Sequence, residues 1–167
     1  MHDKLKLLLE QVNMPVELYS DFKDGNLDRI NVNKKDNSVK FLITLDKILP
    51  VDTYDRLNNL INEKYNMYDE KKVVCNIVSK DYGEVENYYN HFISVYSKKQ
   101  PLLDMFRGIN ITIENDTLTL EVSNKAEEMK LSSILDKLKE DLNNVGYKDL
   151  AINININIEA SNAILKQ

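Results

Sequence analysis

Apolar and polar residues recur along this chain with two periods, and each period predicts a different kind of element. Apolar residues at every second position predict β-strands, whereas apolar residues three and four positions apart predict amphipathic helices. The predicted strands cover residues 27–33, 39–45, 73–78, 109–113, 118–122 and 151–159. The predicted helices cover residues 4–12, 16–22, 52–64, 81–97, 102–106 and 124–142, and residues 161–167 form either a terminal helical segment or the start of a linker.

Polar residues, proline and glycine mark where these elements should begin and end. Pro50 should end the strand before it, because proline lacks the backbone N–H that a strand needs. Three residues that can cap a helix are each followed three positions later by an acidic residue, which is capping-box spacing. These predicted N-caps are Asp52, Asp81 and Asn124. Gly146 is expected to stop the last long helix.

The same periods predict which side chains are buried. On the strands, the inward residues should be Ile30, Val32, Val39, Phe41, Ile43, Leu45, Ile152, Ile154, Ile156 and Ile158. On the helices, they should be Val85, Tyr88, Tyr89, Phe92, Ile93, Tyr96, Met129, Leu131, Ile134, Leu135, Leu138 and Leu142. Asn153, Asn155 and Asn157 alternate with the isoleucines and should face solvent.

A repeat organises these elements into two halves. The polar hairpin turns at Asp36 and Asn115 lie 79 positions apart, and the strands that begin at Val73 and Ala151 lie 78 apart. Each half reads helix, strand, strand, helix, strand, so a shared topology is indicated. We therefore predict an α+β fold with two small tandem units, each a three-stranded sheet with helices on one face. The predicted domains are residues 1–79 and 80–167.

Composition and charge narrow the class of protein. The 167 residues are 43% hydrophobic and 29% charged, which is typical of a globular protein. No apolar run approaches the length of a membrane span, the N-terminus lacks the features of a signal peptide, and the single cysteine, Cys75, allows no internal disulfide. These features favour a cytoplasmic protein without a membrane partner. The net charge of −5 lies entirely in residues 81–167, which argues against that half as a general nucleic-acid binder and is compatible with a monomer.

Residue types that carry chemistry are sparse. His2 and His91 are far apart, no histidine and cysteine cluster has zinc-site spacing, and four glycines form no phosphate-binding loop. We therefore expect no catalytic residue, no metal site and no cofactor in this chain. The nine tyrosines suggest base stacking, but those of the helix at 81–97 lie at core spacing, which favours packing.

Three lysine doublets are the candidate phosphate contacts. They are Lys34 and Lys35, Lys71 and Lys72, and Lys98 and Lys99. Each doublet can equally be a solvated loop feature that keeps the protein soluble.

Three segments resemble one known family. They are KLLLEQVNMP at 6–15, VKFLITLDKILPVDTYDRL at 39–57, and SNKAEEMKL at 123–131, which leads to the ININI strand. Their order resembles the N-terminal region of the PolC-type DNA polymerase III alpha subunit, the replicative polymerase of low-GC Gram-positive bacteria.

The resemblance implies two small domains, the first similar to the alpha-binding domain of the clamp-loader tau subunit and the second KH-like. It also implies that the chain is the N-terminal region alone, with the polymerase and 3'–5' exonuclease residues beyond Gln167. A nucleic-acid-binding KH domain clamps the backbone with a GXXG loop. No GXXG occurs in this sequence, which favours a protein-contact role.

Three functions remain as hypotheses. The first is a non-catalytic docking region that contacts tau, another replisome protein or the remainder of the polymerase. The second is an auxiliary DNA- or RNA-binding module that uses the lysine doublets. The third is a small stand-alone enzyme, which no sequence motif supports.

Overall fold

The computed structural model describes residues 1–157, and the chain divides into two compact units. Unit 1 contains residues 1–84 and 144–147, and unit 2 contains residues 85–143 and the chain from residue 148 onward. The predicted inward position of Ile158, the strand end at Glu159 and the segment 161–167 lie outside the described residues. The assignment of 1–79 and 80–167 as separate domains stays a prediction.

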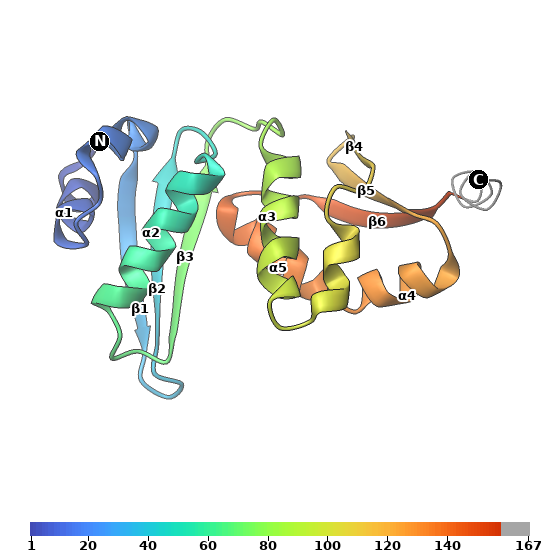
Figure 1. The fold of residues 1–167 in the computed structure, drawn as a ribbon. Coiled ribbons are helices and arrows are strands. Elements are labelled where there is room, and N and C mark those ends of the chain that lie inside the picture. Colours follow the sequence, from blue (N-terminus) through green and yellow to red (C-terminus); the bar gives the residue numbers. More distant parts are fainter. Residues whose placement is uncertain (158–167) are drawn as a thin grey trace. The chain divides into compact units, whose positions relative to one another are not determined.

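Unit 1 is built on a sheet in the order β1-β2-β3, with β1 and β2 antiparallel and β2 and β3 parallel (Figure 1). Helix α2 makes the crossover that two parallel strands require. The elements are α1 (Asp3–Gln11), the 3₁₀ helix η1 (Val16–Phe22), β1 (Asn26–Asn33), β2 (Ser38–Leu45), α2 (Val51–Lys64) and β3 (Glu70–Ile77).

The core of unit 1 lies on one face of the central strand β2. Its alternating residues are 0–3% exposed, as predicted; they are Val39, Phe41, Ile43 and Leu45. Tyr54 of α2 packs over this face and donates its hydroxyl hydrogen bond to the carbonyl oxygen of Val73 in β3, 2.9 Å away. This bond ties the helix to the strand that follows it.

Ile30 and Val32 face the core side of the sheet as predicted, but neither side chain is buried. Both belong to the edge strand β1, and they are 47% and 51% exposed. Their partners in β2 are Phe41 and Val39, so they do lie on the core side of the sheet. A β-bulge between Leu27 and Arg29 shifts the register of β1, which places Leu27 on that side too. Leu27 is covered, but the second half of the strand is not.

Unit 2 repeats the topology with a sheet in the order β4-β5-β6, again antiparallel and then parallel. Each unit also has a 3₁₀ helix after its first helix. The elements are α3 (Val85–Ser97), η2 (Pro101–Phe106), β4 (Ile111–Glu114), β5 (Thr117–Val122), α4 (Lys125–Ser132), α5 (Leu135–Val145) and β6 (Ala151–Ile156). The α+β fold with two three-stranded sheets is therefore confirmed.

The hairpin turns contain residues in the left-handed region. Asn37 has φ of 51°, and Asn115 and Asp116 have φ of 51° and 59°. Asparagine and aspartate tolerate this conformation better than most residues, so the turns form where the sequence indicates. On β6, Asn153 and Asn155 are exposed while the isoleucines between them are half-buried, which confirms the predicted alternation.

Helix α4 begins as predicted. Asn124 is its N-cap, and the side-chain oxygen accepts a hydrogen bond from the backbone N–H of Glu127 at 2.9 Å. Glu127 in turn accepts from the N–H of Ser123 at 2.9 Å.

The other two predicted caps are wrong. Helix α2 begins at Val51, with Pro50 at the N-cap position and no side-chain cap, so Asp52 lies within the first turn. Helix α3 begins at Val85, because the Asp81 carboxylate instead accepts the N–H of Gly83 in a turn before the helix. The fixed φ of Pro50 favours a helix that starts directly after it, at Val51. The Asp81 carboxylate is already used in the turn with Gly83, so it does not cap α3.

The single helix predicted at 124–142 is two helices. Helix α4 ends at Ser132, and α5 begins at Leu135. The Ser133 hydroxyl donates to the carbonyl oxygen of Lys130 at 2.6 Å, which is the kind of local bond that bends or ends a helix. Met129, predicted to be inward, is 65% exposed. The last helix ends at Val145, and Gly146 follows with φ of 132°, as predicted.

We expect replacement of Asn124 by alanine to lower the free energy of unfolding of unit 2 by about 1 kcal/mol, because the N–H of Glu127 loses its acceptor. Urea denaturation followed by circular dichroism measures this change. Asn124→Asp is the control and should be nearly neutral, because aspartate caps helices equally well. Equal losses for the two variants would contradict the capping role.

Candidate docking surface

The described residues hold no group of three or more histidine, cysteine, aspartate or glutamate side chains that could bind a metal ion. Cys75 is buried in β3, as its apolar strand pattern predicts. Within residues 1–157, no helix combines the length and apolar character that a membrane crossing needs.

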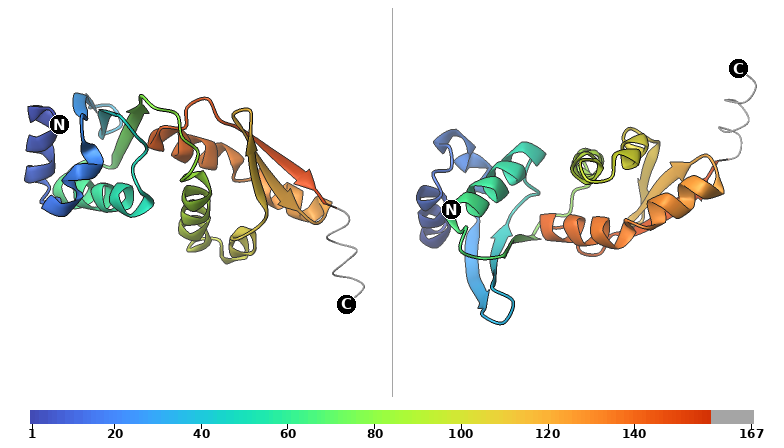
Figure 2. Two further views of the ribbon diagram at one scale, coloured as in Figure 1. Left: turned by 90° about the horizontal axis from the view of Figure 1, so that it is seen from above. Right: turned by 60° about the horizontal axis from the view of Figure 1, so that its bottom comes forward.

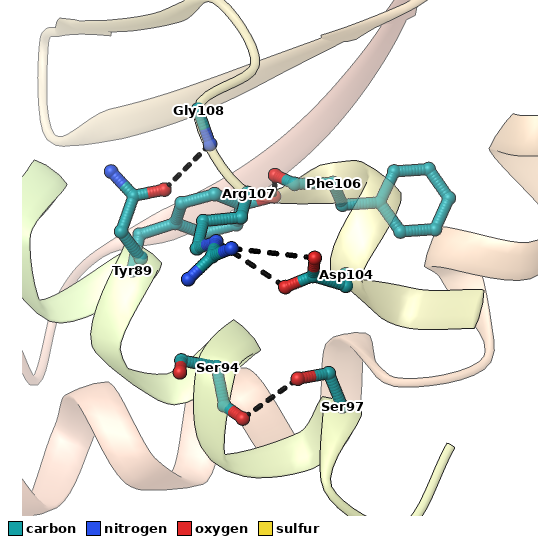
Figure 3. A network of polar contacts seen from close by, with 8 residues as sticks. Tyr89, Ser94, Ser97, Asp104, Phe106, Arg107 and Gly108 are labelled. Atoms are coloured by element: carbon teal, nitrogen blue, oxygen red, sulfur yellow. Dashed lines mark hydrogen bonds and ion pairs between the residues drawn. The ribbon is translucent and has the colours of Figure 1, made fainter. Parts of the chain in front are cut away.

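The tyrosines of α3 are packed. Tyr88 and Tyr89 are both 0% exposed, and the Tyr89 hydroxyl donates to the carbonyl oxygen of Phe106 at 2.8 Å (Figure 3). Burial raises the pKa of Tyr89 well above its usual value, because the charged phenolate loses its hydration. Tyr96 is half-buried and donates its hydroxyl to a carboxylate oxygen of Asp141. These rings hold unit 2 together and offer no face for a base.

The polar groups in the same region satisfy each other locally. Figure 3 shows Arg107 paired through two nitrogens with the carboxylate of Asp104, at 3.3 Å each. The N–H of Gly108 donates to the side-chain oxygen of Asn90 at 2.9 Å. These bonds fix the chain after η2, and Arg107 is already committed to a neighbouring carboxylate.

The lysine doublets occupy three different settings. Lys34 and Lys35 are exposed in the β1–β2 turn of unit 1, and Lys98 and Lys99 are exposed just after α3 in unit 2. Lysines after a helix C-terminus interact favourably with its dipole, which gives the last doublet a local role.

The pleat of β3 separates the two members of the remaining doublet. Lys71 pairs with Val39 and lies on the core side, where its Nζ donates to the carbonyl oxygen of Tyr68 at 3.0 Å. Lys72 pairs with Lys40 and lies on the opposite, open side, 3.2 Å from Glu70. Neighbouring strand residues point to opposite faces, so Lys71 and Lys72 do not share one face of the sheet.

The open face of unit 1 brings together basic residues that the sequence reasoning missed. Three cross-strand rows form the half of this face nearest the hairpin turn; they are Arg29–Leu42–Val74, Asn31–Lys40–Lys72 and Asn33–Ser38–Glu70. Lys40 alternates with Val39 and Phe41, so the sequence alone predicts that it faces outward. Which residues lie beside it on the neighbouring strands depends on the strand pairing. Asn31, Asn33, Lys40 and Lys72 also line a hollow of about 280 Å³ at the hairpin end of the sheet.

The open face of unit 2 has the opposite character. The outward residues of β4, β5 and β6 contain two carboxylates and no lysine or arginine within the described part of the sheet; they are Thr112, Glu114, Thr117, Thr119, Glu121, Ala151, Asn153 and Asn155. Glu121 accepts a hydrogen bond from Asn110 at 2.6 Å and another from Asn157. This face therefore offers no electrostatic attraction to phosphate.

The second half of β1 is an uncovered apolar edge. Ile30 and Val32 lie on its core side and remain about half exposed. The views in Figures 1 and 2 agree that the β1–β2 hairpin extends beyond α1, which lies beside the first half of β1. We call residues 29–33 the free edge. A sheet edge of this kind exposes both unpaired backbone groups and apolar side chains, and proteins usually protect it.

Residues 4–74, which lie within unit 1, match the family described as DNA polymerase III polC-type N-terminus I. A DNA polymerase III PolC-type from Oceanobacillus iheyensis is 29% identical over 137 residues, which cover 80% of this chain and 10% of that protein. One from Streptococcus thermophilus is 22% identical over 171 residues, which cover 98% of this chain and 12% of that protein.

These similarities confirm the predicted resemblance over most of the chain. The chain spans about a tenth of the length of the curated relatives that it matches.

Proposed function

Because the chain is similar to the N-terminal region of PolC-type DNA polymerase III, we propose that it is a non-catalytic docking region of a replicative DNA polymerase. The whole protein would carry out template-directed DNA synthesis with 3'–5' proofreading. The proposed partners are tau, another polymerase-associated protein or the remaining domains of the polymerase, and the proposed location is the cytoplasm. The KH-like and tau-like comparisons of the two units belong to this proposal.

The exposed free edge of β1 is the structural feature that best supports the docking role. Ile30 and Val32 are about half exposed beside a well-packed core, and burial of a whole aliphatic side chain contributes roughly 1.5–3 kcal/mol. Covering the exposed halves of both would therefore contribute about 1.5–3 kcal/mol to a complex. Within residues 1–157, about half of each side chain remains uncovered.

One observation favours the second candidate function, nucleic-acid binding. Arg29, Lys40 and Lys72 share the open face of unit 1, where phosphates could be neutralised. Two features count against it. Glu70 lies 3.2 Å from Lys72 on the same face, and none of the residues in the three rows is aromatic, so bases would find no stacking platform. The described outward residues of the unit 2 sheet add no lysine or arginine.

We expect the 167-residue chain to bind one of the proposed protein partners and not to bind labelled single-stranded DNA at about 0.15 M salt. Biolayer interferometry against purified tau and the remaining polymerase domains measures the first interaction, and fluorescence anisotropy measures the second. The Lys40→Glu, Lys72→Glu double variant tests the open face, with Lys98→Glu, Lys99→Glu as a matched control in unit 2.

The outcome that would contradict docking is specific. If no protein partner binds, while DNA binds with steep salt dependence that only the Lys40 and Lys72 variant removes, the chain is a nucleic-acid module. Salt dependence of that kind reflects release of counterions from phosphates.

A further inference from the structure

We propose that the free edge of β1 binds an extended segment of a partner protein as a fourth strand of the unit 1 sheet. The segment would carry apolar residues at alternate positions, with acidic residues between them. This inference rests on the docking function proposed above and specifies the chemistry of the partner.

The backbone of β1 provides the first reason. In an antiparallel pair, alternate residues direct their N–H and C=O groups toward the partner strand, and the residues between them direct theirs away from it. β1 is the terminal strand of the sheet, with β2 on one side. Among the described residues, the backbone of 29–33 pairs with β2 and makes no backbone hydrogen bond to another element. Its outward groups are therefore available to an added strand, as in other complexes formed by strand addition.

The core side of the sheet sets the apolar positions of the segment. Ile30 continues a row through Phe41 to Val73, and Val32 continues a row through Val39 to Lys71. Phe41 is itself packed against the ring of Tyr65, at a centroid distance of 5.1 Å. A fourth strand would extend each row by one residue. Because side chains alternate along a strand, apolar residues two positions apart would cover Ile30 and Val32 together.

The open side sets the charge of the segment. The residue that an added strand places beside Arg29 would meet an exposed guanidinium that forms no ion pair with the described residues. Lys34 and Lys35 lie exposed in the adjoining turn. The nearby carboxylates remain negative, because their partners are neutral hydroxyls; Asp28 accepts from the Thr44 hydroxyl at 2.6 Å, and Asp36 accepts from the Ser38 hydroxyl at 2.6 Å. Residues 28–36 therefore carry three positive and two negative charges, and this small positive excess attracts an acidic segment.

A second copy of this chain fits the same edge poorly. A second copy would bring an edge with the same positive excess in residues 28–36, so it lacks the excess of acidic residues that this edge attracts. The corresponding edge strand of unit 2, β4, is only four residues long, and its outward side chains include Glu114, which would repel an acidic segment. The free edge of β1 is thus the better match for an acidic strand.

A synthetic peptide tests the inference directly. The probe is a capped nine-residue peptide in which glutamate and valine alternate, labelled for fluorescence anisotropy with the 167-residue chain. Its symmetric pattern suits either strand direction. We expect binding that weakens at least tenfold when lysine replaces glutamate in the peptide. N-methylation of alternate peptide nitrogens provides the sharper test, because one set of N–H groups faces β1 and the other set faces solvent. Methylation of one set should abolish binding, and methylation of the other should leave it nearly unchanged.

Variants of the chain locate the site. Ile30→Thr with Val32→Thr removes the apolar contact and keeps strand propensity, and it should weaken peptide binding at least tenfold. Asn31→Thr with Asn33→Thr changes the same strand on the open side and is the matched control. Arg29→Glu should weaken binding of the acidic peptide and strengthen binding of the lysine peptide. Thermal melts confirm that each variant is folded.

The remaining outcomes separate failure of strand addition from failure of the docking function. Absence of binding at millimolar peptide, or equal effects of the two methylation patterns, would exclude strand addition. A dimer of the chain that the Ile30 and Val32 variant dissociates would assign the edge to a second copy. If a protein partner binds the double variant as tightly as the unmodified chain, docking stands and strand addition at β1 fails. If the peptide binds as expected but no protein partner does, the free edge can accept an added strand, and the proposed docking function fails.

Discussion

Replacement of Phe41 by alanine is expected to lower the free energy of unfolding of unit 1 by about 3–5 kcal/mol, because a fully buried ring leaves a cavity that the sheet cannot close. Phe41 is 0% exposed in the central strand, between Ile30 and Val73. Urea unfolding followed by amide hydrogen exchange of peptides from β1, β2 and β3 measures the loss.

A neighbouring residue provides the control. Leu42 follows Phe41 in the same strand but faces the open side and is half-buried. Leu42→Ala removes fewer contacts and should cost clearly less than Phe41→Ala. Equal losses would mean that the core is not on the helix side of the sheet. A stable Phe41→Ala variant would also contradict the row of contacts that supports the free edge.

Replacement of Tyr89 by alanine is expected to have a similar effect on unit 2, about 3–5 kcal/mol. The side chain is 0% exposed, so the variant leaves a cavity next to η2. It also removes the donor that pairs with the carbonyl oxygen of Phe106, 2.8 Å away. Amide exchange of peptides from α3 and η2 during urea unfolding measures this effect.

The Tyr89→Phe variant separates the two contributions. It keeps the ring and removes the hydroxyl, so its loss should be near 1 kcal/mol, the typical net contribution of one hydrogen bond. If both variants were equally destabilised, the hydrogen bond rather than the packing of the ring would dominate. If Tyr89→Phe were neutral, the carbonyl oxygen of Phe106 would have another donor.

The two units share a topology but differ in the surfaces that their sheets present. The unit 1 sheet presents Arg29, Lys40 and Lys72, whereas the outward residues of the unit 2 sheet include Glu114 and Glu121. A repeated fold can therefore carry two different contact surfaces, since function depends on the residues of a site and not on the fold. The docking proposal concerns the first of these surfaces and its free edge.

Amino-acid sequence by itself determined the elements, their order and most of the core. The period-two runs became strands, Asn115 and Asp116 made the tight turn, and Asn124 capped α4. These features depend on residues within a few positions of each other, so local patterns are sufficient to predict them. The two-unit repeat and the polar face of β6 follow from the same local periods.

Tertiary structure decided what depends on pairing between distant residues. Ile30 and Val32 alternate like core residues, yet they are exposed because β1 is the edge of the sheet and α1 covers only its first half. Lys71 and Lys72 read as one basic doublet, but the pleat places them on opposite faces. The candidate docking surface depends on strand order and register. Long-range contacts set both, and no period along a single strand specifies which strand ends a sheet.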